Sequence, residues 1–358
     1  MNTTDDTQDV QAKPARKRRS CLGCLGRAAI GLVVILAIAM VAGAIYQAAA
    51  SASDLKKYPP PGKLYAVGDR QSHLYCTGEG SPTVILEGGA GSPSTTWFMV
   101  QEKVAEFTRV CSYDRPGFGW SEPGSGPLSS NQVAANLHGL LEVAGIPGPY
   151  VLVGHSAGGV YVRAYASQYP SEVLGMVLVD SSHESQNLRF PARFQEYSAR
   201  QDGMVRLCKA ISPIGAIRLL KLYHTMIPEN IAASDWGAAA MTTMYRTSYC
   251  DSSYDEMVAI AESFSQPEGP APLGDMPLIV LSAGGTFKEI PETIVSAIGQ
   301  DVLDQMEQVS QELQQELVGL STQGEQVIAE ESSHYIQWDQ PDLVIDAIRT
   351  IVEQVRAE

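Results

Sequence analysis

Hydrophobic and polar residues are arranged in three ways along the chain. Residues 28–46 form an unbroken apolar run. Residues 63–181 and 277–358 alternate short apolar runs with amphipathic stretches, and residues 182–276 carry helical periodicity without a clear strand. Short runs rich in Val, Ile and Leu indicate strands buried on both faces, and the stretches between them indicate covering helices. The pattern predicts an α/β protein with a mainly parallel sheet.

Eight of the apolar runs have the length and composition of strands. The first two, residues 63–70 and 72–80, are expected to form an opening antiparallel pair. The other six are residues 83–89, 109–115, 150–156, 175–181, 277–284 and 326–332. Helices are predicted where cap candidates, a preceding turn or a proline mark a start, at residues 130–144, 158–168 and 341–356.

The stretch from residue 182 to 276 interrupts this alternation. It inserts about 95 residues between two core strands, and these residues are rich in Met and Tyr. We interpret it as a helical cap over the sheet. The α/β core is then divided into a first part, residues 63–181, and a second part, residues 277–358.

Residues 28–46 have the properties of a transmembrane helix. These 19 residues contain no charge, and as a helix they extend about 28 Å, close to the thickness of the hydrocarbon core. The basic tail, residues 1–27, should stay in the cytoplasm. A single-pass helix then places the rest of the chain on the opposite side of the membrane, outside the cytoplasm. A cleaved signal peptide is the alternative, since Ala48, Ala50 and Ser51 supply small residues for a cleavage site.

Charge separates the tail from the rest of the chain. Residues 1–27 carry about +3, whereas the remainder carries 19 basic against 37 acidic residues, within a net charge of -15. An acidic body repels nucleic acid, so no nucleic-acid partner is expected. Residues 47–62, between the apolar run and the first strand, are expected to be a linker that ends in a proline run.

The candidate nucleophile, Ser156, lies in a G-x-S-x-G motif from Gly154 to Gly158, between an apolar strand and a helix. A sharp turn from strand to helix lifts the serine out of the sheet and leaves room only for very small neighbours. The following helix points its free N–H groups and the positive end of its dipole at the site, which suits a developing oxyanion. A purely structural glycine turn is the alternative.

A serine hydroxyl is a weak nucleophile and needs a base. His334 is the candidate because it directly follows the last predicted strand and comes last in the order nucleophile, acid, histidine. The other histidines precede the nucleophile, lie within its turn or belong to the cap: His73, His138, His155, His183 and His224.

Two backbone N–H groups are candidates for an oxyanion hole. Gly88 and Gly89 follow the third predicted strand, and their missing side chains let a backbone N–H approach a substrate oxygen. We nominate the N–H groups of Gly89 and Ala157. A plain glycine turn is the alternative for this loop.

Four blocks of residues have an order and spacing typical of one family. They are Glu87 to Ser92 with Trp97, Tyr113 to Ser121, Gly154 to Gly158, and Ser333 to Tyr335 followed by Pro341. Through them the chain resembles serine hydrolases of the alpha/beta hydrolase superfamily, of the alpha/beta hydrolase-1 type, over residues 63–356. The resemblance implies an α/β-hydrolase fold with an eight-stranded sheet, a Ser-His-acid triad, and Gly89 and Ala157 in the oxyanion hole. Many members have His at the position of Glu87, so this loop departs from the family pattern.

The acid of the triad is open between two residues. In the family the carboxylate usually follows the strand predicted at residues 277–284, where the first carboxylate is Glu289. Asp180 ends the preceding strand, at the sheet edge where active-site residues of open α/β sheets gather. We favour Asp180, for which a structural capping role is the alternative.

Four cysteines lie beyond the apolar run. Cys76 and Cys111 are on the second and fourth predicted strands, which are neighbours in sheets of this family, so the resemblance favours a bridge between them. Cys208 and Cys250 are then left to bridge within the cap. Oxidising conditions outside the cytoplasm permit both bridges, and four free cysteines are the alternative.

These features predict a hydrolase without metal or cofactor that cleaves an ester or related acyl compound of small size, with Ser156 as nucleophile and His334 as base. The serine argues against epoxide hydrolases and haloalkane dehalogenases, which need a carboxylate there. An aminopeptidase of the proline-iminopeptidase kind and a non-catalytic binding module are the alternatives. The aromatic residues of the cap are expected mainly to pack its own core: Tyr223, Trp236, Tyr245 and Tyr249.

Overall fold

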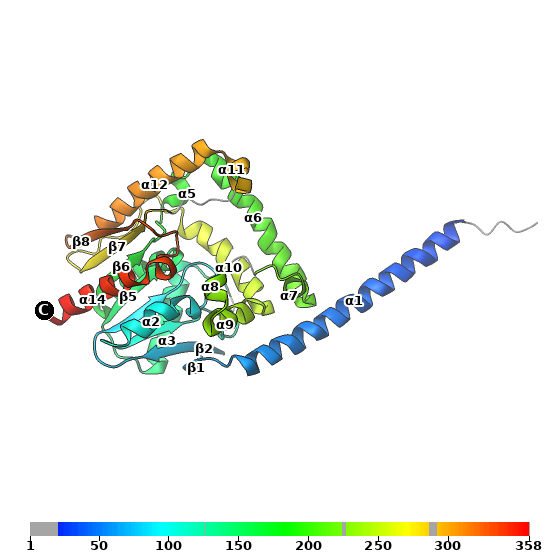
Figure 1. The fold of residues 1–358 in the computed structure, drawn as a ribbon, viewed down its shortest axis with the longest axis horizontal. Helices are drawn as coiled ribbons and strands as arrows, with labels where there is room; N and C mark the ends of the chain where they lie inside the picture. Colours follow the sequence, from blue (N-terminus) through cyan, green and yellow to red (C-terminus); the bar gives the residue numbers. More distant parts are fainter. Residues whose placement is uncertain (1–20, 125, 224–226, 286–291, 358) are drawn as a thin grey trace, which may run out of the picture.

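The computed structural model describes residues 21–124, 126–223, 227–285 and 292–357. Figure 1 shows an α/β body with one long helix, α1, projecting from it. At the centre of the body lies an eight-stranded sheet in the order β1-β2-β4-β3-β5-β6-β7-β8. The predicted fold class is confirmed.

All eight predicted strands are present. β2 pairs antiparallel with β1 and β4, and the remaining neighbours are parallel. Side chains of the central strands alternate between two cores, with Ile85 facing one and Val84 and Leu86 the other, which explains why these strands are apolar throughout. The strands are β1 Lys63–Val67, β2 Arg70–Thr77, β3 Thr83–Glu87, β4 Val110–Tyr113, β5 Tyr150–His155, β6 Val173–Val179, β7 Leu278–Ala283 and β8 Gly324–Ala329.

Helices cover both faces of the sheet (Figure 1). On one face lie α2 (Phe98–Val104) and α14 (Pro341–Ala357), and on the other α3 (Ser130–Ala144), α4 (Ala157–Gln168) and α12 (Gln300–Val318). The three helices predicted from capping signals are confirmed to within one residue at each end.

The cap is built from helices between β6 and β7. Tyr223, Tyr245 and Tyr249 are buried in an apolar cluster, as expected, whereas Trp236 stacks on Phe98 of the core at a ring distance of 6.2 Å. The helices are α5 Gln186–Arg189, α6 Ala192–Ile211, the 3-10 turn η3 Ser212–Ile214, α7 Ala216–Leu219, α8 Glu229–Ala232, α9 Asp235–Met244 and α10 Thr247–Ser263. Two shorter elements, α11 Glu292–Ile298 and α13 Ile336–Asp339, flank the second part of the core.

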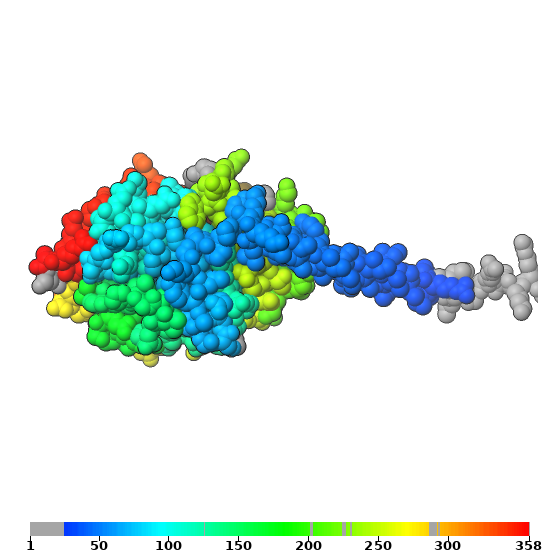
Figure 2. Space-filling view, turned by 90° about the horizontal axis from the view of Figure 1, so that it is seen from below, coloured from blue at the N-terminus to red at the C-terminus, as the bar shows by residue number. Residues whose placement is uncertain are grey.

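Helix α1 runs from Cys21 to Lys57 and contains the apolar run. It is long and apolar enough to cross a membrane, and its most apolar 18-residue window is entirely unburied. Figure 2 shows the C-terminal part of α1 lying along the body and the rest extending away from it. The basic tail before residue 21 lies outside the described residues.

The structure corrects the expectation of a linker over residues 47–62. This segment is helical up to Lys57 because polar side chains of α1 bond the cap: the amide of Gln47 donates to the backbone oxygen of Tyr245 at 2.6 Å. The residues that follow are also held, since the indole N–H of Trp120 donates to the oxygen of Tyr58 at 3.0 Å. Helix α1 and the body therefore form one continuous unit.

Two disulfides are present among the described residues. Cys76–Cys111 joins β2 to β4, where the two cysteines are direct partners in the antiparallel register. Cys208–Cys250 joins α6 to α10 within the cap. Both predicted pairings are confirmed.

Candidate active site

Ser156 sits at the turn between β5 and α4. Its backbone has φ 54° and ψ −125°, a conformation that L residues rarely adopt and that costs about 1–3 kcal/mol. The turn needs glycine on both sides, because a Cβ at Gly158 would lie 2.6 Å from the backbone oxygens of Glu87 and Gly88. Ser156 is half-buried, whereas His155 and Ala157 beside it are buried. The turn therefore presents the serine at the carboxyl edge of the sheet.

His334 and Asp180 are paired at the same edge. Nδ1 of His334, in the loop after β8, lies 2.6 Å from Oδ2 of Asp180, directly after β6. The second carboxylate oxygen accepts the backbone N–H of Ala283 at 3.1 Å. Asp180 is 7% exposed, so the carboxylate is fixed and largely shielded from water. With Nδ1 facing Asp180, Nε2 is the ring nitrogen left to face a reacting group.

The loop that carries His334 contacts the nucleophile turn directly. Nε2 of His155 lies 2.9 Å from the backbone oxygen of His334, and the two rings are 4.7 Å apart. Burial, with a contribution from His334, lowers the pKa of His155 to about 3. His155 is therefore neutral and donates this hydrogen bond, which holds the His334 loop against the turn of Ser156.

The structure thus brings together Ser156, His334 and Asp180, which come from the ends of three parallel strands. The competing acid, Glu289, lies outside the described residues. Among the described residues, no group of three or more His, Cys, Asp or Glu side chains is arranged to hold a metal ion.

Gly89 lies against the nucleophile. A Cβ at this position would be 3.1 Å from the Cβ of Ser156, so any side chain there would crowd the nucleophile. Arg115 fixes the peptide planes of the loop: its guanidinium donates to the oxygen of Gly88 at 2.9 Å and to that of Gly89 at 2.6 Å. Because a trans peptide points its C=O and N–H in opposite directions, the N–H of Gly89 faces away from Arg115. Ala157 is the first residue of α4, whose leading N–H groups have no acceptor within the helix.

A buried charge network supports this loop from behind. The Arg115 guanidinium lies between two carboxylates, 2.5 Å from Glu87 and 2.9 Å from Glu256. Glu256 also accepts the N–H of Gly91 at 2.7 Å, and Tyr161 donates to it at 3.1 Å. The network therefore ties the glycine loop to cap helix α10.

Burial has opposite consequences for the two sides of this network. It raises the pKa of the Glu87 carboxyl, an effect that Arg115 only partly offsets. Burial alone would lower the pKa of Arg115, but Glu256 and Glu87 raise it above its ordinary value. Glu87 is thus the partner of a permanently charged arginine. Glu256 was not predicted, because no local pattern marks a cap residue whose partners lie far away in the chain.

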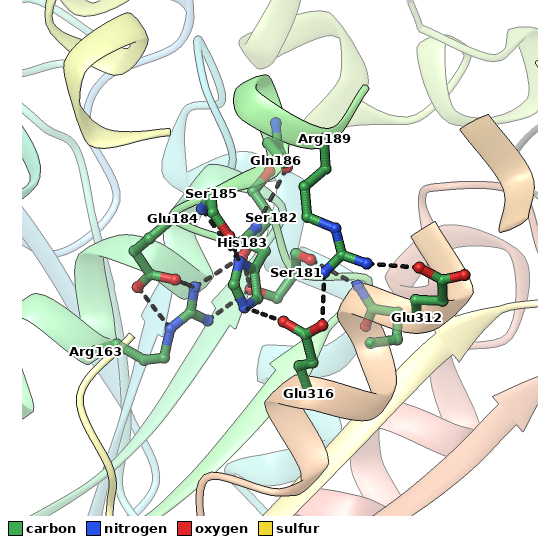
Figure 3. A network of polar contacts seen from close by, with 11 residues as sticks. Arg163, Ser181, Ser182, His183, Glu184, Ser185, Gln186, Arg189, Glu312 and Glu316 are labelled. Atoms are coloured by element: carbon green, nitrogen blue, oxygen red, sulfur yellow. Dashed lines mark hydrogen bonds and ion pairs between the residues drawn. The ribbon is translucent and has the colours of Figure 1, made fainter. Parts of the chain in front are cut away.

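A second network fixes the chain after Asp180 (Figure 3). Arg163 of α4 binds the Glu184 carboxylate through two nitrogens, at 2.9 and 2.8 Å, and donates to Ser181 Oγ at 2.9 Å. The N–H of Ser182 donates to the oxygen of Ser156 at 2.9 Å. The helix that follows the nucleophile and the segment that follows the acid are therefore locked together.

An apolar cavity lies between the glycine loop and the cap. It contacts Gly91 of the loop and Tyr335, the neighbour of His334, and its cap wall consists mainly of α8 and α9 residues, such as Ile231, Trp236 and Met244. None of its described lining residues is charged. The cavity therefore suits an uncharged, apolar group held between the glycine loop and the cap.

Comparison with known proteins identifies the family. Residues 84–347 match the model of the alpha/beta hydrolase family, so the chain belongs to this family. An AB hydrolase superfamily protein of Gibberella zeae is 25% identical over 297 residues, which cover 77% of this chain and 87% of that protein. The probable transporter efuK of Hormonema carpetanum is 27% identical over 296 residues, 78% of this chain. The match spans only 40% of the length of efuK.

Solved structures show the same fold. A thermophilic esterase from Thermogutta terrifontis superimposes with a TM-score of 0.54 at 19% identity, covering 82% of this chain and 98% of the esterase. At this identity the likeness establishes the fold alone. The family assignment and the structural likeness therefore agree on the fold.

Proposed function

We propose that the protein is a serine hydrolase that cleaves an ester or a related acyl compound through an acyl-enzyme intermediate. The observation that supports this most directly is the 2.6 Å contact between His334 Nδ1 and Asp180 Oδ2, made beside a Ser156 held in a strained turn. The three side chains come from distant parts of the chain, and a purely structural turn does not need this convergence.

The mechanism follows from the geometry. Ser156 Oγ attacks the substrate carbonyl carbon while Nε2 of His334 takes the hydroxyl proton, and Asp180 stabilises the resulting imidazolium. The N–H groups of Gly89 and Ala157 stabilise the oxyanion. The histidine returns its proton to the leaving alcohol. Water, deprotonated by His334, then attacks the acyl carbon; the histidine returns this proton to Ser156 Oγ as the acyl–Oγ bond breaks and the carboxylic acid leaves.

The cavity favours an ester over an aminoacyl substrate. An aminopeptidase needs a group that binds the substrate's ammonium, and the described residues that line the cavity carry no charge. Glu256 of the cap accepts a hydrogen bond from Gly91 of the glycine loop, but its carboxylate is already paired with Arg115. An ester with an uncharged acyl or alcohol group is the substrate class that fits.

We further propose that α1 is an uncleaved membrane anchor with the basic tail in the cytoplasm and the hydrolase body outside. The apolar run of α1 supports the anchor, and the basic residues before it support the orientation. The two disulfides fit an oxidising compartment.

Active-site labelling tests the enzymatic proposal. Full-length protein in detergent is treated with a fluorophosphonate, and then assayed on esters graded by acyl length and on aminoacyl amides. Ser156→Ala should lose labelling and lower turnover by about 10⁴-fold or more, whereas the control Ser265→Ala should behave as wild type. Labelling that persists in Ser156→Ala would reject the nucleophile. Hydrolysis of amides but not esters would support the aminopeptidase, and folded protein without either activity would support a binding module.

A further inference from the structure

Helix α1 meets the cap at the end of its apolar run. Gly43 lies so close to η3 that a Cβ there would be 2.4 Å from the oxygen of Ile214. Four residues further on, Gln47 is 4% exposed and bonded to the cap. Between these two positions lies Tyr46, the last residue of the apolar run. At a helix rise of about 1.5 Å per residue, η3 lies within a few ångströms of the level at which α1 would leave a hydrocarbon core.

A charge pair fixes the rotation of the cap about α1. Nη1 of Arg218, in α7, lies 2.5 Å from Oδ2 of Asp54 in α1. The guanidinium also sits over the ring of Tyr245 at 4.9 Å, and Arg218 and Asp54 are mostly shielded from solvent. Figure 1 shows α6 and α7 on the side of the body from which α1 projects. The same edge of the cap is therefore held against α1.

This edge carries exposed leucines. Leu219, Leu220 and Leu222 directly follow the Arg218 anchor and are 61%, 66% and 46% exposed. Single exposed apolar side chains are ordinary, but three within four residues form a patch of the kind that marks an interaction site. Lys221, exposed between them, is suited to the headgroup level of a membrane.

We propose that Leu219, Leu220 and Leu222 form a membrane-contact patch that inserts into the lipid bilayer crossed by α1. The proposal rests on α1 being a membrane anchor. Lipid is the occupant favoured by the structure, because the contact of Gly43 with η3 places this edge of the cap close to the level where the apolar run of α1 ends, and the Arg218–Asp54 pair holds the same edge against α1. The geometry requires no partner chain to cover these leucines.

The patch also bears on the substrate. Helix α9 contributes Trp236 and Met244 to the wall of the apolar cavity, and Tyr245, which follows α9, is bonded to Gln47 of α1. The cavity wall therefore rests on the helix that enters the bilayer. A site placed in this way takes an ester that is dissolved in the membrane, and inserted leucines keep the cavity wall at the bilayer surface.

Quenching by brominated lipids measures insertion without depending on activity. Full-length variants with one added tryptophan are reconstituted in phosphatidylcholine vesicles with brominated acyl chains, and native fluorescence is subtracted. Leu220→Trp should be quenched strongly. Val143→Trp is the matched control, since Val143 is 53% exposed on α3 of the core, outside the patch, and it should not be quenched. Leu36→Trp, in the apolar run, reports whether α1 itself is inserted.

The outcomes separate the patch from the proposals on which it rests. Quenching at Leu36→Trp but not at Leu220→Trp would overturn the patch and leave the anchor. If Leu36→Trp is not quenched, both the membrane anchor and the membrane-contact patch are overturned. If Leu220→Trp is unquenched at high protein density and becomes quenched when the protein is diluted in lipid, the patch would be assigned to a dimer instead.

Activity adds a second arm. Replacing all three leucines by glutamine should lower hydrolysis of a long-chain ester embedded in the vesicles about 10-fold and leave hydrolysis of a water-soluble ester unchanged. Val143→Gln should affect neither. If wild type and the triple glutamine variant hydrolyse the embedded ester at equal rates, the proposed substrate class is contradicted. If wild type hydrolyses neither the embedded nor the water-soluble ester, the proposed enzyme is rejected and the quenching result still stands.

Discussion

The carboxylate of Asp180 accepts one hydrogen bond from His334 and another from the backbone of Ala283. Its amide isostere cannot hold a protonated imidazole, so Asp180→Asn should lower turnover on the best ester by about 10⁴-fold with a normal circular dichroism spectrum. The matched control is Glu289→Gln, which should remain near wild type. The reverse pattern would move the acid to the loop after β7, and two mild effects would mean that another group orients the histidine.

Glu256 tests the link between the cap and the glycine loop. Glu256→Gln keeps the shape but removes the charge beside Arg115, and the loss of a charge-assisted hydrogen bond in a buried site should lower the stability by about 2 kcal/mol. The loop that carries Gly89 is then held less firmly, so kcat should fall about 10-fold with little change in KM. Glu262→Gln, an exposed change on the same helix, is the control. A change in stability with kcat intact would show that the loop keeps its geometry without the cap.

The elements explain how far sequence reasoning could go. Ser156, Asp180 and His334 follow β5, β6 and β8, and strands of a parallel sheet bring their carboxyl ends to one edge, so a local motif and chain order suffice to predict the group. The Arg115–Glu256 pair has no such rule, because helix α10 is placed by tertiary packing. The helix over residues 47–57 was missed for the same reason: its polar residues look like a linker until the cap supplies their partners.

At the scale of elements, His73 joins β2 to the turn after β4. Its Nδ1 lies 2.7 Å from Asp114, and its Nε2 contacts the oxygen of Pro61. Burial alone would lower the pKa of His73, but Asp114 and Pro61 raise it above the ordinary value. A folded-state pKa above the unfolded one gives stability that is full below about pH 6.5 and is lost as the pH rises through the folded value.

The prediction is a difference between two proteins. At pH 6 the midpoint of thermal unfolding should be higher for wild type than for His73→Gln. The difference between the two midpoints should become smaller as the pH is raised to 9. Measuring both proteins in the same buffers cancels the titration of other groups. A gap that stays constant or widens would show that His73 is neutral in the folded protein.

At the scale of the whole molecule, the orientation can be tested with sealed membranes. Protease added on the cytoplasmic side should leave everything beyond residue 47 intact, because the proposed orientation puts the body on the other side. Alkylation of the unreduced, denatured ectodomain should modify none of its four cysteines. Digestion of the body would reverse the orientation. A mature chain that starts near Ser51 would instead show that the apolar run is cleaved.

The continuity of α1 with the body has a consequence for how the proposed membrane-anchored hydrolase would meet its substrate. A domain on a flexible tether tumbles and samples a volume above the membrane. Here Gln47, Asp54 and Tyr58 hold the body to the span, so any sideways tilt of the body must tilt the span as well. The remaining freedom is spin about the membrane normal and lateral drift. For an anchored protein and an ester dissolved in the membrane, encounters would then be a search in two dimensions, in which the surface density of the ester, and not its bulk concentration, sets the rate.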